Sequence, residues 1–347
     1  MNFYRISCSS LGSIFCVAIT LIQTSLAQTN APSWTKPAGL KLGDTIAIVA
    51  PAGPVDVQQV KDYAQQLESL GYKVVVSPNI GRRTGYLAGT DQERVDELNV
   101  AIRDPKVRAI FAARGGFGLT RILDQIDYAA LAKDPKIVTG YSDLTGLHLA
   151  IARKARMISF HGPMPMSNLV KSDQAEYRYA NECFWRTLDA KKYPAGQVGF
   201  PIMLPENWKT EALVNGKATG RLLGGNLTLI TATLGTEYAI EPEGAILFLE
   251  DIEEAPYRVD RMLSQLRLVG ALDKLAGVVL GDFTYKNGAE QAQMEAVFHD
   301  YFDKASYPVL WKFPCGHIAA NANLPHGALA ELDADNGILK LLENPVK

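Results

Sequence analysis

Cysteine and histidine are scarce in this sequence: its 347 residues include four cysteines and five histidines. Cys8 and Cys16 lie in an apolar N-terminal segment, which leaves Cys183 and Cys315 for the rest of the chain. Two cysteines exclude a disulfide framework, and whether they form a single bridge stays open. The sequence also lacks a His-Glu-x-x-His motif and any cluster of cysteine with histidine, so that its pattern gives little support to a metal site.

An excess of charge of either sign is also absent. Lys and Arg number 35, and Asp and Glu number 37, which gives a formal net charge of −2 at pH 7. A nearly neutral, slightly acidic surface does not attract a phosphate backbone. We therefore expect no nucleic-acid partner.

Long apolar runs are missing except at the N-terminus. There, Arg5 precedes an uncharged stretch that begins at Ile6 and ends at Ala27, with the small residue Ser25 two positions earlier. Charged, apolar and small residues in this order predict a secretory signal peptide at residues 1–27, cleaved after Ala27. An N-terminal membrane anchor is the alternative, because the stretch is long enough to span a bilayer. We expect an exported, periplasmic protein without membrane contact after cleavage.

Apolar segments alternate with helical patterns in residues 35–165, which we expect to form an N-terminal domain. This alternation predicts an α/β fold with a mostly parallel, doubly wound sheet, and ligand sites beyond the carboxyl ends of its strands. Strands are expected at residues 46–50, 74–76, 107–113, 137–139 and 157–160, and helices after Asp56, after the capping box Thr90–Glu93, around Ile122 and Leu123, and after Ser142.

The periodic pattern weakens in residues 166–217, which we interpret as an interdomain connection with one helix near residues 175–188. Residues 218–347 are expected to form a second α/β domain that is mixed and richer in β-structure. Its expected strands are residues 245–249 and 277–280, followed by a hairpin of residues 328–334 and 338–342 around Asn336-Gly337.

A turn, Gly140-Tyr141-Ser142-Asp143, joins an expected strand directly to an expected helix. Ser and Asp are good N-caps, so this turn can simply start a helix. It can also be a nucleophile elbow, which holds a serine hydroxyl beside backbone N–H donors. The Gly-rich segment Arg114–Gly118 lacks the spacing of a phosphate-binding loop, but glycine lets its backbone approach an oxyanion closely.

A serine hydrolase also needs a base, and an acid that orients the base. His148 lies on the apolar side of its helix and is expected in the core, whereas His299 lies in a polar helix and is expected to face solvent. His161 ends a strand and His317 lies in a glycine-containing loop, so either can line a site. His326 follows a proline and is expected to be peripheral.

Two carboxylates, Glu250 and Asp251, follow the wholly apolar strand at residues 246–249. Burying a carboxylate there is costly unless it has a partner. Either residue can cap the next helix, but Glu253 and Glu254 can do so as well and would leave Glu250 free.

Taken together, these motifs resemble the LD-carboxypeptidase family of serine peptidases, which includes the microcin C self-immunity peptidases. The matching segments occur in family order from Gly43 to Leu332 and cover nearly all of the chain after residue 27. They are GDTIAIVAPAGPV, YLAGT, RGGFG, GYSD, FHGP, LLGGNL, LEDIEEAPYRVDR and CGHIAAN.

The resemblance implies a Ser-Glu-His triad of Ser142, Glu250 and His317, with backbone N–H groups of Gly116 and Asp143 as the oxyanion hole. It implies no cofactor. Family members remove the terminal D-alanine of the murein tetrapeptide, cleaving after the L-configured centre of meso-diaminopimelate. We therefore expect a peptide derived from murein, the cell-wall peptidoglycan, as the substrate. Free peptide and intact sacculus both stay open, as does a homodimer.

A carboxypeptidase must also recognise a free carboxylate, which a guanidinium group matches with two hydrogen bonds. Arg114, Arg258 and Arg261 are the candidates, and His161 is a further candidate for substrate binding.

Several alternatives remain. Within the family, the chain can be a microcin-like peptidyl-nucleotide hydrolase. A periplasmic muropeptide-binding protein without catalysis would also have two α/β lobes and a signal peptide. An α/β-hydrolase esterase shares the Ser-Glu-His order, although Leu144 stands where Gly-x-Ser-x-Gly has its second glycine. A nucleophile pair of Cys315 with His317 is disfavoured, because adjacent turn positions direct their side chains apart.

Overall fold

The first of two β-sheets carries the Ser142 turn. The computed structural model describes residues 34–189 and 198–347, so that the predicted signal peptide lies outside the described residues. In the first sheet the strand order is β12-β5-β4-β3-β1-β2, and every neighbouring pair is parallel except β12 with β5. These strands are β1 (Thr45–Val49), β2 (Lys73–Val76), β3 (Val107–Ala112), β4 (Ile137–Gly140), β5 (Ser159–His161) and β12 (Leu324–His326).

Helices cover both faces of this sheet, because successive side chains of a strand point to opposite faces. Ile46 and Ile48 of β1 belong to a core that includes side chains of two helices, α1 (Val57–Ser69) and α5 (Ala175–Leu188). Ala47 and Val49 belong to a second core, with side chains from the other three helices of this part of the chain. Those helices are α2 (Asp91–Arg103), α3 (Tyr128–Lys133) and α4 (Leu144–Ala155). The predicted doubly wound, mostly parallel sheet is confirmed.

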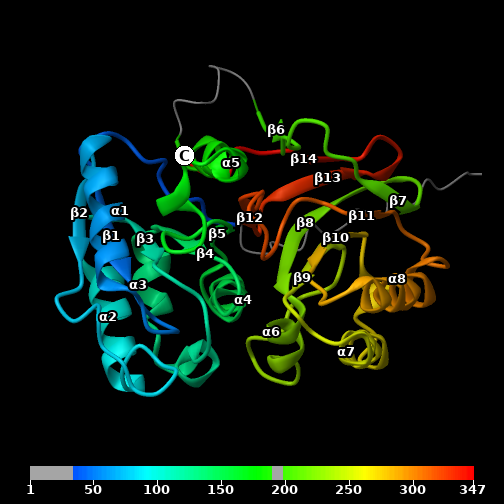
Figure 1. Cartoon of the computed structure of the whole chain (residues 1–347), viewed down its shortest axis with the longest axis horizontal. Coiled ribbons are helices and arrows are strands. Elements are labelled where there is room, and N and C mark those ends of the chain that lie inside the picture. The colour runs from blue at the N-terminus through cyan, green and yellow to red at the C-terminus, as the bar shows by residue number, and fades with distance from the viewer. Residues whose placement is uncertain (1–33, 190–197) are drawn as a thin grey trace, which may run out of the picture. The chain divides into compact units, whose positions relative to one another are not determined.

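The second sheet is mixed and has the order β6-β14-β13-β8-β9-β10-β11-β7 (Figure 1). Its central strands β8, β9, β10 and β11 are parallel, and the flanking pairs are antiparallel. The strands are β6 (Phe200–Pro201), β7 (Glu211–Val214), β8 (Lys217–Asn226), β9 (Ala245–Asp251), β10 (Gly277–Phe283), β11 (Val309–Trp311), β13 (Leu329–Asp333) and β14 (Ile338–Leu341). The predicted mixed, β-rich second part is also confirmed.

Three helices cover one face of the second sheet, namely α6 (Leu227–Ala232), α7 (Pro256–Leu268) and α8 (Gly288–Phe302). The opposite face, which includes Phe248, packs into the same core as Phe160 of β5 and Phe184 of α5. One continuous apolar core therefore joins the two sheets. In addition, β12 lies in sequence between β11 and β13 of the second sheet but pairs with β5 of the first. The predicted domain boundaries near residues 166 and 218 stay a prediction.

Local signals in the sequence mark most helix starts. The Asp56 carboxylate accepts hydrogen bonds from the backbone N–H groups of Gln58 and Gln59, and Thr90 with Glu93 forms the predicted capping box. The helix expected around Ile122 and Leu123 is instead two short 3-10 turns, Leu119–Arg121 and Leu123–Gln125. Ile122 separates them with a φ of −127°, outside the helical range.

Both cysteines of the described ranges, Cys183 and Cys315, are buried and free. No helix in residues 34–189 or 198–347 is both long and apolar enough to traverse a bilayer. Within the same ranges, His, Cys, Asp and Glu side chains form no group of three or more that could bind a metal ion.

Candidate active site

Ser142 adopts a left-handed backbone conformation, with a φ of 65°, in the turn between β4 and α4. For a residue with a side chain, this conformation costs about 1–2 kcal/mol. The N-cap of α4 is Asp143, and its side chain caps nothing; one carboxylate oxygen instead accepts the backbone N–H of Leu119 at 2.9 Å. The turn is therefore no ordinary capped helix start, and a strained serine between a strand and a helix matches a nucleophile elbow.

The Gly-rich turn at residues 114–118 lies directly against Ser142. A Cβ atom built on Gly115 would be 2.8 Å from the Ser142 Cβ and 3.1 Å from its Oγ, so that only glycine allows this approach. Gly116 has a φ of 123°, and its Cα lies close to Gly53. The backbone N–H groups of Gly116 and Asp143 donate to no acceptor in the described parts of the chain. Both predicted oxyanion donors are thus free.

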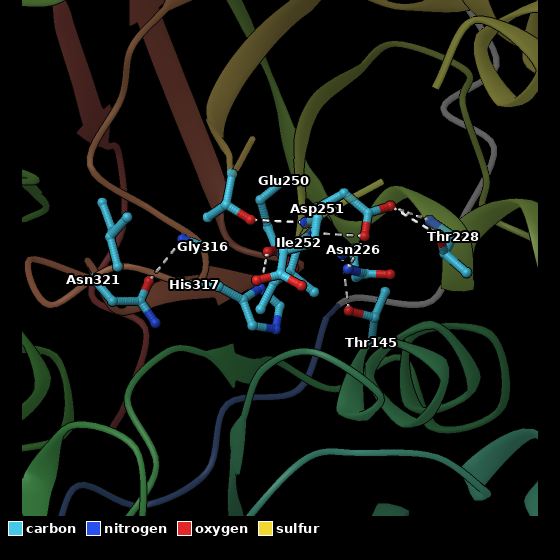
Figure 2. A network of polar contacts seen from close by, with 12 residues as sticks. Thr145, Asn226, Thr228, Glu250, Asp251, Ile252, Gly316, His317 and Asn321 are labelled. Carbon is cyan, nitrogen blue, oxygen red and sulfur yellow. Dashed lines mark hydrogen bonds and ion pairs between the residues drawn. The ribbon is translucent and has the colours of Figure 1, made fainter. Parts of the chain in front are cut away.

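Glu250 at the end of β9 and His317 in the loop after β11 lie side by side (Figure 2). Nδ1 of His317 lies 2.6 Å from Oε2 of Glu250, which is a short, charge-assisted hydrogen bond. Glu250 is fully buried near the end of β9, and His317 lies in the loop between β11 and β12. Gly316 permits this contact, because a Cβ there would lie 3.0 Å from the Glu250 Cβ.

Burial and charge pairing act in opposite directions on these two groups. Burial alone would lower the pKa of His317, but the Glu250 carboxylate, with Asp251 and Asp282 nearby, raises it above 6.5. Burial alone would raise the pKa of Glu250, but His317 and His161 lower it to about 2. The Glu250 carboxylate is therefore ionised at neutral pH, and the imidazole becomes a stronger base.

Asp251, the residue after Glu250, fixes the end of β9. Its carboxylate accepts hydrogen bonds from the Asn226 side chain at 2.8 Å and from the backbone N–H and hydroxyl of Thr228, both at 2.9 Å (Figure 2). The backbone N–H of Asn226 in turn donates to the Thr145 hydroxyl on α4 at 3.0 Å. These contacts connect the strand of Glu250 to the helix that follows Ser142.

No carboxylate caps helix α7. Its N-cap is Ala255, which makes no capping hydrogen bond with its side chain, and Pro256 occupies the first turn. Proline is favoured there because its missing N–H would lack a partner anyway. All four acidic residues considered as caps in the sequence are therefore free of that role, and Glu250 pairs with His317 instead.

Three buried histidines lie behind this pair. His148 is a core residue as predicted, with ring nitrogens 2.8 Å from the Ser159 hydroxyl and 2.8 Å from the Gly140 carbonyl. The prediction that His326 is peripheral is wrong: it is fully buried, and its ring centroid lies 5.9 Å from that of His148. The reason is that residues 324–326 form a strand that pairs with β5 and packs against Phe248 of the second sheet.

His161 is also fully buried, with Nε2 3.6 Å from Oε1 of Glu250. This burial argues against the direct substrate contact considered from the sequence. His299, in contrast, is a surface residue as predicted, and its Nδ1 lies 2.8 Å from the Asp303 carboxylate.

The three candidate arginines lie in different surroundings. Arg114 lines a cavity of about 410 Å³ together with Asp56, Arg83 and Ser167. Arg258 lies 3.3 Å from Glu254, and both Arg258 and Arg261 lie over the Tyr257 ring. Neither Arg83 nor Arg114 forms an ion pair with any residue that the structure describes. Arg83 was not predicted from the sequence, although it lies only three residues before the YLAGT segment.

The fold and this site define a class of protein: a serine-type hydrolase of two α/β parts. The N-terminal domain of LD-carboxypeptidases matches residues 46–162, and their C-terminal domain matches residues 219–332. The chain therefore belongs to the LD-carboxypeptidase family and is a serine carboxypeptidase.

Individual relatives agree with this assignment. A probable murein peptide carboxypeptidase of Bacillus subtilis is 38% identical over 301 residues, which are 86% of this chain and 91% of that protein. The crystal structure of a muramoyltetrapeptide carboxypeptidase from Oxalobacter formigenes is 32% identical and covers 86% of this chain and 97% of its own, with a TM-score of 0.72.

The microcin C7 self-immunity protein MccF of Escherichia coli is also similar, at 29% identity over 334 residues, 88% of this chain and 95% of MccF. A structure of MccF in complex with glutamyl sulfamoyl guanosine has a TM-score of 0.82 at 27% identity. It covers 90% of this chain and 99% of its own.

Proposed function

We propose that this protein is an LD-carboxypeptidase that hydrolyses the meso-diaminopimelate–D-alanine bond of murein tetrapeptides and releases D-alanine. The observation that carries the proposal is the buried Glu250–His317 hydrogen bond of 2.6 Å, with the His317 ring 4.9 Å from that of Tyr141, the residue before the strained Ser142. The similarity to a murein peptide carboxypeptidase and to a muramoyltetrapeptide carboxypeptidase supports the choice of substrate.

In this proposal Ser142 is the nucleophile, His317 the base and Glu250 the orienting acid. Because Nδ1 of His317 is bound to Glu250, its Nε2 accepts the Ser142 proton as Oγ attacks the carbonyl that precedes D-alanine. His317 then gives this proton to the amine of D-alanine as the C–N bond breaks. Water, activated by the same imidazole, hydrolyses the acyl-enzyme and restores the Ser142 hydroxyl.

The oxyanion of the tetrahedral intermediate would bind to the free N–H groups of Gly116 and Asp143. One such donor contributes about 3 kcal/mol to transition-state stabilisation in comparable sites. Glycine at position 115 lets this turn lie directly against Ser142, so both donors would stand close to the nucleophile.

The free carboxylate of D-alanine would bind in the cavity lined by Arg83 and Arg114. Arg114 directly precedes Gly115, and Ser167 of the same cavity lies near the Tyr141 hydroxyl. The cavity therefore begins beside the Ser142 turn. Two guanidinium groups without a carboxylate partner provide the charge that a carboxypeptidase needs and an endopeptidase does not.

The signal-peptide pattern at residues 1–27 leads us to propose that the protein is exported and acts on murein or its released peptides in the periplasm.

A peptidyl-nucleotide is the second candidate substrate, on the basis of the similarity to MccF. A cavity of about 450 Å³ lies at the end of β10 and is lined by Asp282, Trp208 and Tyr285, among others. Its aromatic side chains offer flat surfaces on which a nucleobase can stack.

The deciding experiment is incubation with L-Ala-γ-D-Glu-meso-diaminopimelate-D-Ala, with release of D-alanine measured by mass spectrometry. We expect tripeptide and D-alanine in equal amounts, and no reaction when the last residue is L-alanine. A peptidyl sulfamoyl adenosine serves as the parallel substrate. Cleavage of that compound alone would reject the murein assignment in favour of the second candidate.

A further inference from the structure

Glu250 has a second carboxylate oxygen that the triad does not use. Oε2 accepts the hydrogen bond from His317, whereas Oε1 is buried and hydrogen-bonds to no residue in the described ranges. Nε2 of His161 lies 3.6 Å from Oε1. Glu250 belongs to β9 of the second sheet and His161 to β5 of the first, so this contact crosses between the two sheets.

The surroundings of His161 offer it no other partner. Neither ring nitrogen hydrogen-bonds to a described residue, and the side chain is fully buried. Its ring packs against aromatic rings on several sides, with centroid distances of 5.1 Å to Phe248, 6.1 Å to His148 and 6.2 Å to Tyr141. A buried donor and a buried acceptor are each costly alone, and facing one another they reduce that cost.

We propose that His161 is a positioning residue, whose Nε2–H holds Oε1 of Glu250 so that Oε2 remains directed at His317. The 3.6 Å separation is longer than a hydrogen bond, so the attraction is mainly electrostatic. In a buried site such an attraction is little screened by solvent. The Glu250 carboxylate is thus held between two imidazoles, one from each half of the molecule. The effect on catalysis rests on the proposed function, whereas the contact itself does not.

Other groups also act on the Glu250–His317 pair. Four groups interact electrostatically with Glu250: Asp251 on β9, Asp282 on β10, Cys315 of the His317 loop and Tyr141 of the Ser142 turn. A test must leave all of these unchanged. It therefore compares different side chains at position 161 alone.

The test uses two amides of different length. The side-chain amide of His161→Gln reaches the place of Nε2 and can still direct an N–H group at Oε1, whereas that of His161→Asn reaches only the place of Nδ1. We measure the pKa of His317 by NMR titration of the full chain, with the resonance assigned through His317→Gln. We also measure kcat and KM for D-alanine release.

We expect His161→Asn to raise the pKa of His317 by about half a unit, because the carboxylate loses a competing donor and becomes more basic. Its kcat should fall roughly tenfold to a hundredfold through misplacement of the pair, with KM within about twofold. His161→Gln should retain values near the wild type in both measurements. The proposal would be overturned if the pKa of His317 and kcat were the same in the wild type and both variants. It would also be overturned if both variants changed these two quantities by the same amount.

Two further variants separate positioning from packing. His161→Phe keeps a ring against Phe248 but has no donor. It should therefore raise the pKa of His317 and lower kcat as expected for His161→Asn, and it provides the same test if His161→Asn does not fold. His326→Asn removes a buried imidazole that packs on Phe248 and does not contact Glu250. It should leave the pKa of His317 and kcat unchanged. Absence of D-alanine release by the wild type would reject the proposed function alone, because the NMR titration needs no substrate.

Discussion

The Tyr141 ring lies edge-on against the His317 imidazole, with centroids 4.9 Å apart and an interplanar angle of 66°. Tyr141 directly precedes Ser142 in the turn after β4 of the first sheet, whereas His317 lies in the loop after β11 of the second sheet. Burial raises the pKa of Tyr141 to about 12, so the phenol stays neutral beside Glu250. This ring contact brings the segment of the predicted nucleophile to the predicted base.

The backbone strain at Ser142 can be measured separately from its chemistry. Ser142→Ala and Ser142→Gly both remove the hydroxyl, and we expect both to abolish D-alanine release. Ser142→Gly should be more stable than Ser142→Ala by about 1 kcal/mol, because glycine adopts a φ of 65° without steric cost. Urea denaturation of both variants provides the comparison. Equal stability would show that the turn is not strained, and turnover by either variant would reject Ser142 as the nucleophile.

The Glu250–His317 pair predicts the pH dependence of the reaction. His317 must be neutral to act as base, and its pKa is raised above 6.5 by Glu250. We therefore expect kcat/KM to fall as the pH decreases through a value above 6.5. Glu250→Gln removes the charge that raises this pKa. In this variant the acidic limb of the kcat/KM profile should therefore move to lower pH, while kcat falls. A limb that stays in place in this variant would contradict the pairing.

The same pair has a linked effect on stability. Because the folded pKa of His317 is raised, its contribution is fully present below pH 6.5 and is lost as the pH rises through the folded value. The folded pKa of Glu250 is lowered from 4.5 to about 2, so its contribution is present above pH 4.5 and is lost as the pH falls towards 2. Unfolding curves of the wild type and Glu250→Gln across this range would reveal both windows.

Much of the fold could be predicted from short-range signals. Alternation of strands and helices, the capping box at Thr90 and the hairpin at Asn336-Gly337 depend on neighbouring residues, and the structure has all three. The burial of His326 could not be predicted, because it depends on β12 pairing with a strand more than 150 residues earlier. The location of Arg83 in the cavity could not be predicted either, because the cavity forms where loops that are distant in sequence come together.

For the candidate site, the sequence indicated which groups need a partner, whereas the catalytic roles of these residues stay a prediction. The carboxylate at the end of a buried strand required a partner, and the structure supplies His317 at 2.6 Å. That partner could be chosen only through the family resemblance, since loop position alone left His161 and His317 equivalent. Burial separates the two: the His161 side chain is fully buried, whereas that of His317 is 11% exposed and can reach a substrate.

The close approach of Gly115 to Ser142 should make position 115 intolerant of any side chain. In Gly115→Ala the new Cβ would lie 2.8 Å from the Ser142 Cβ, so the turn must shift away from the hydroxyl. We expect kcat to fall by roughly a hundredfold, as for a displacement of about 1 Å at a catalytic group. Gly288→Ala is the matched control, because a Cβ there meets nothing within 4 Å. Unchanged kcat in Gly115→Ala would show that the glycine turn does not support catalysis.

Recognition of the terminal carboxylate can be assigned to the cavity of Arg83 and Arg114 by changing the substrate as well as the protein. Replacing the D-alanine carboxylate with an amide removes the charge, so the wild type should discriminate against the amide by at least tenfold in kcat/KM. Arg114→Met keeps the length of the side chain and should lose most of this discrimination, and Arg83→Met should lose part of it. Arg258→Met is the matched control, since Arg258 lies outside the cavity and beside Glu254. A different result would be that both cavity variants still prefer the carboxylate over the amide, while Arg258→Met does not. The site that binds the terminal carboxylate would then lie at α7, where Arg258 supplies the charge.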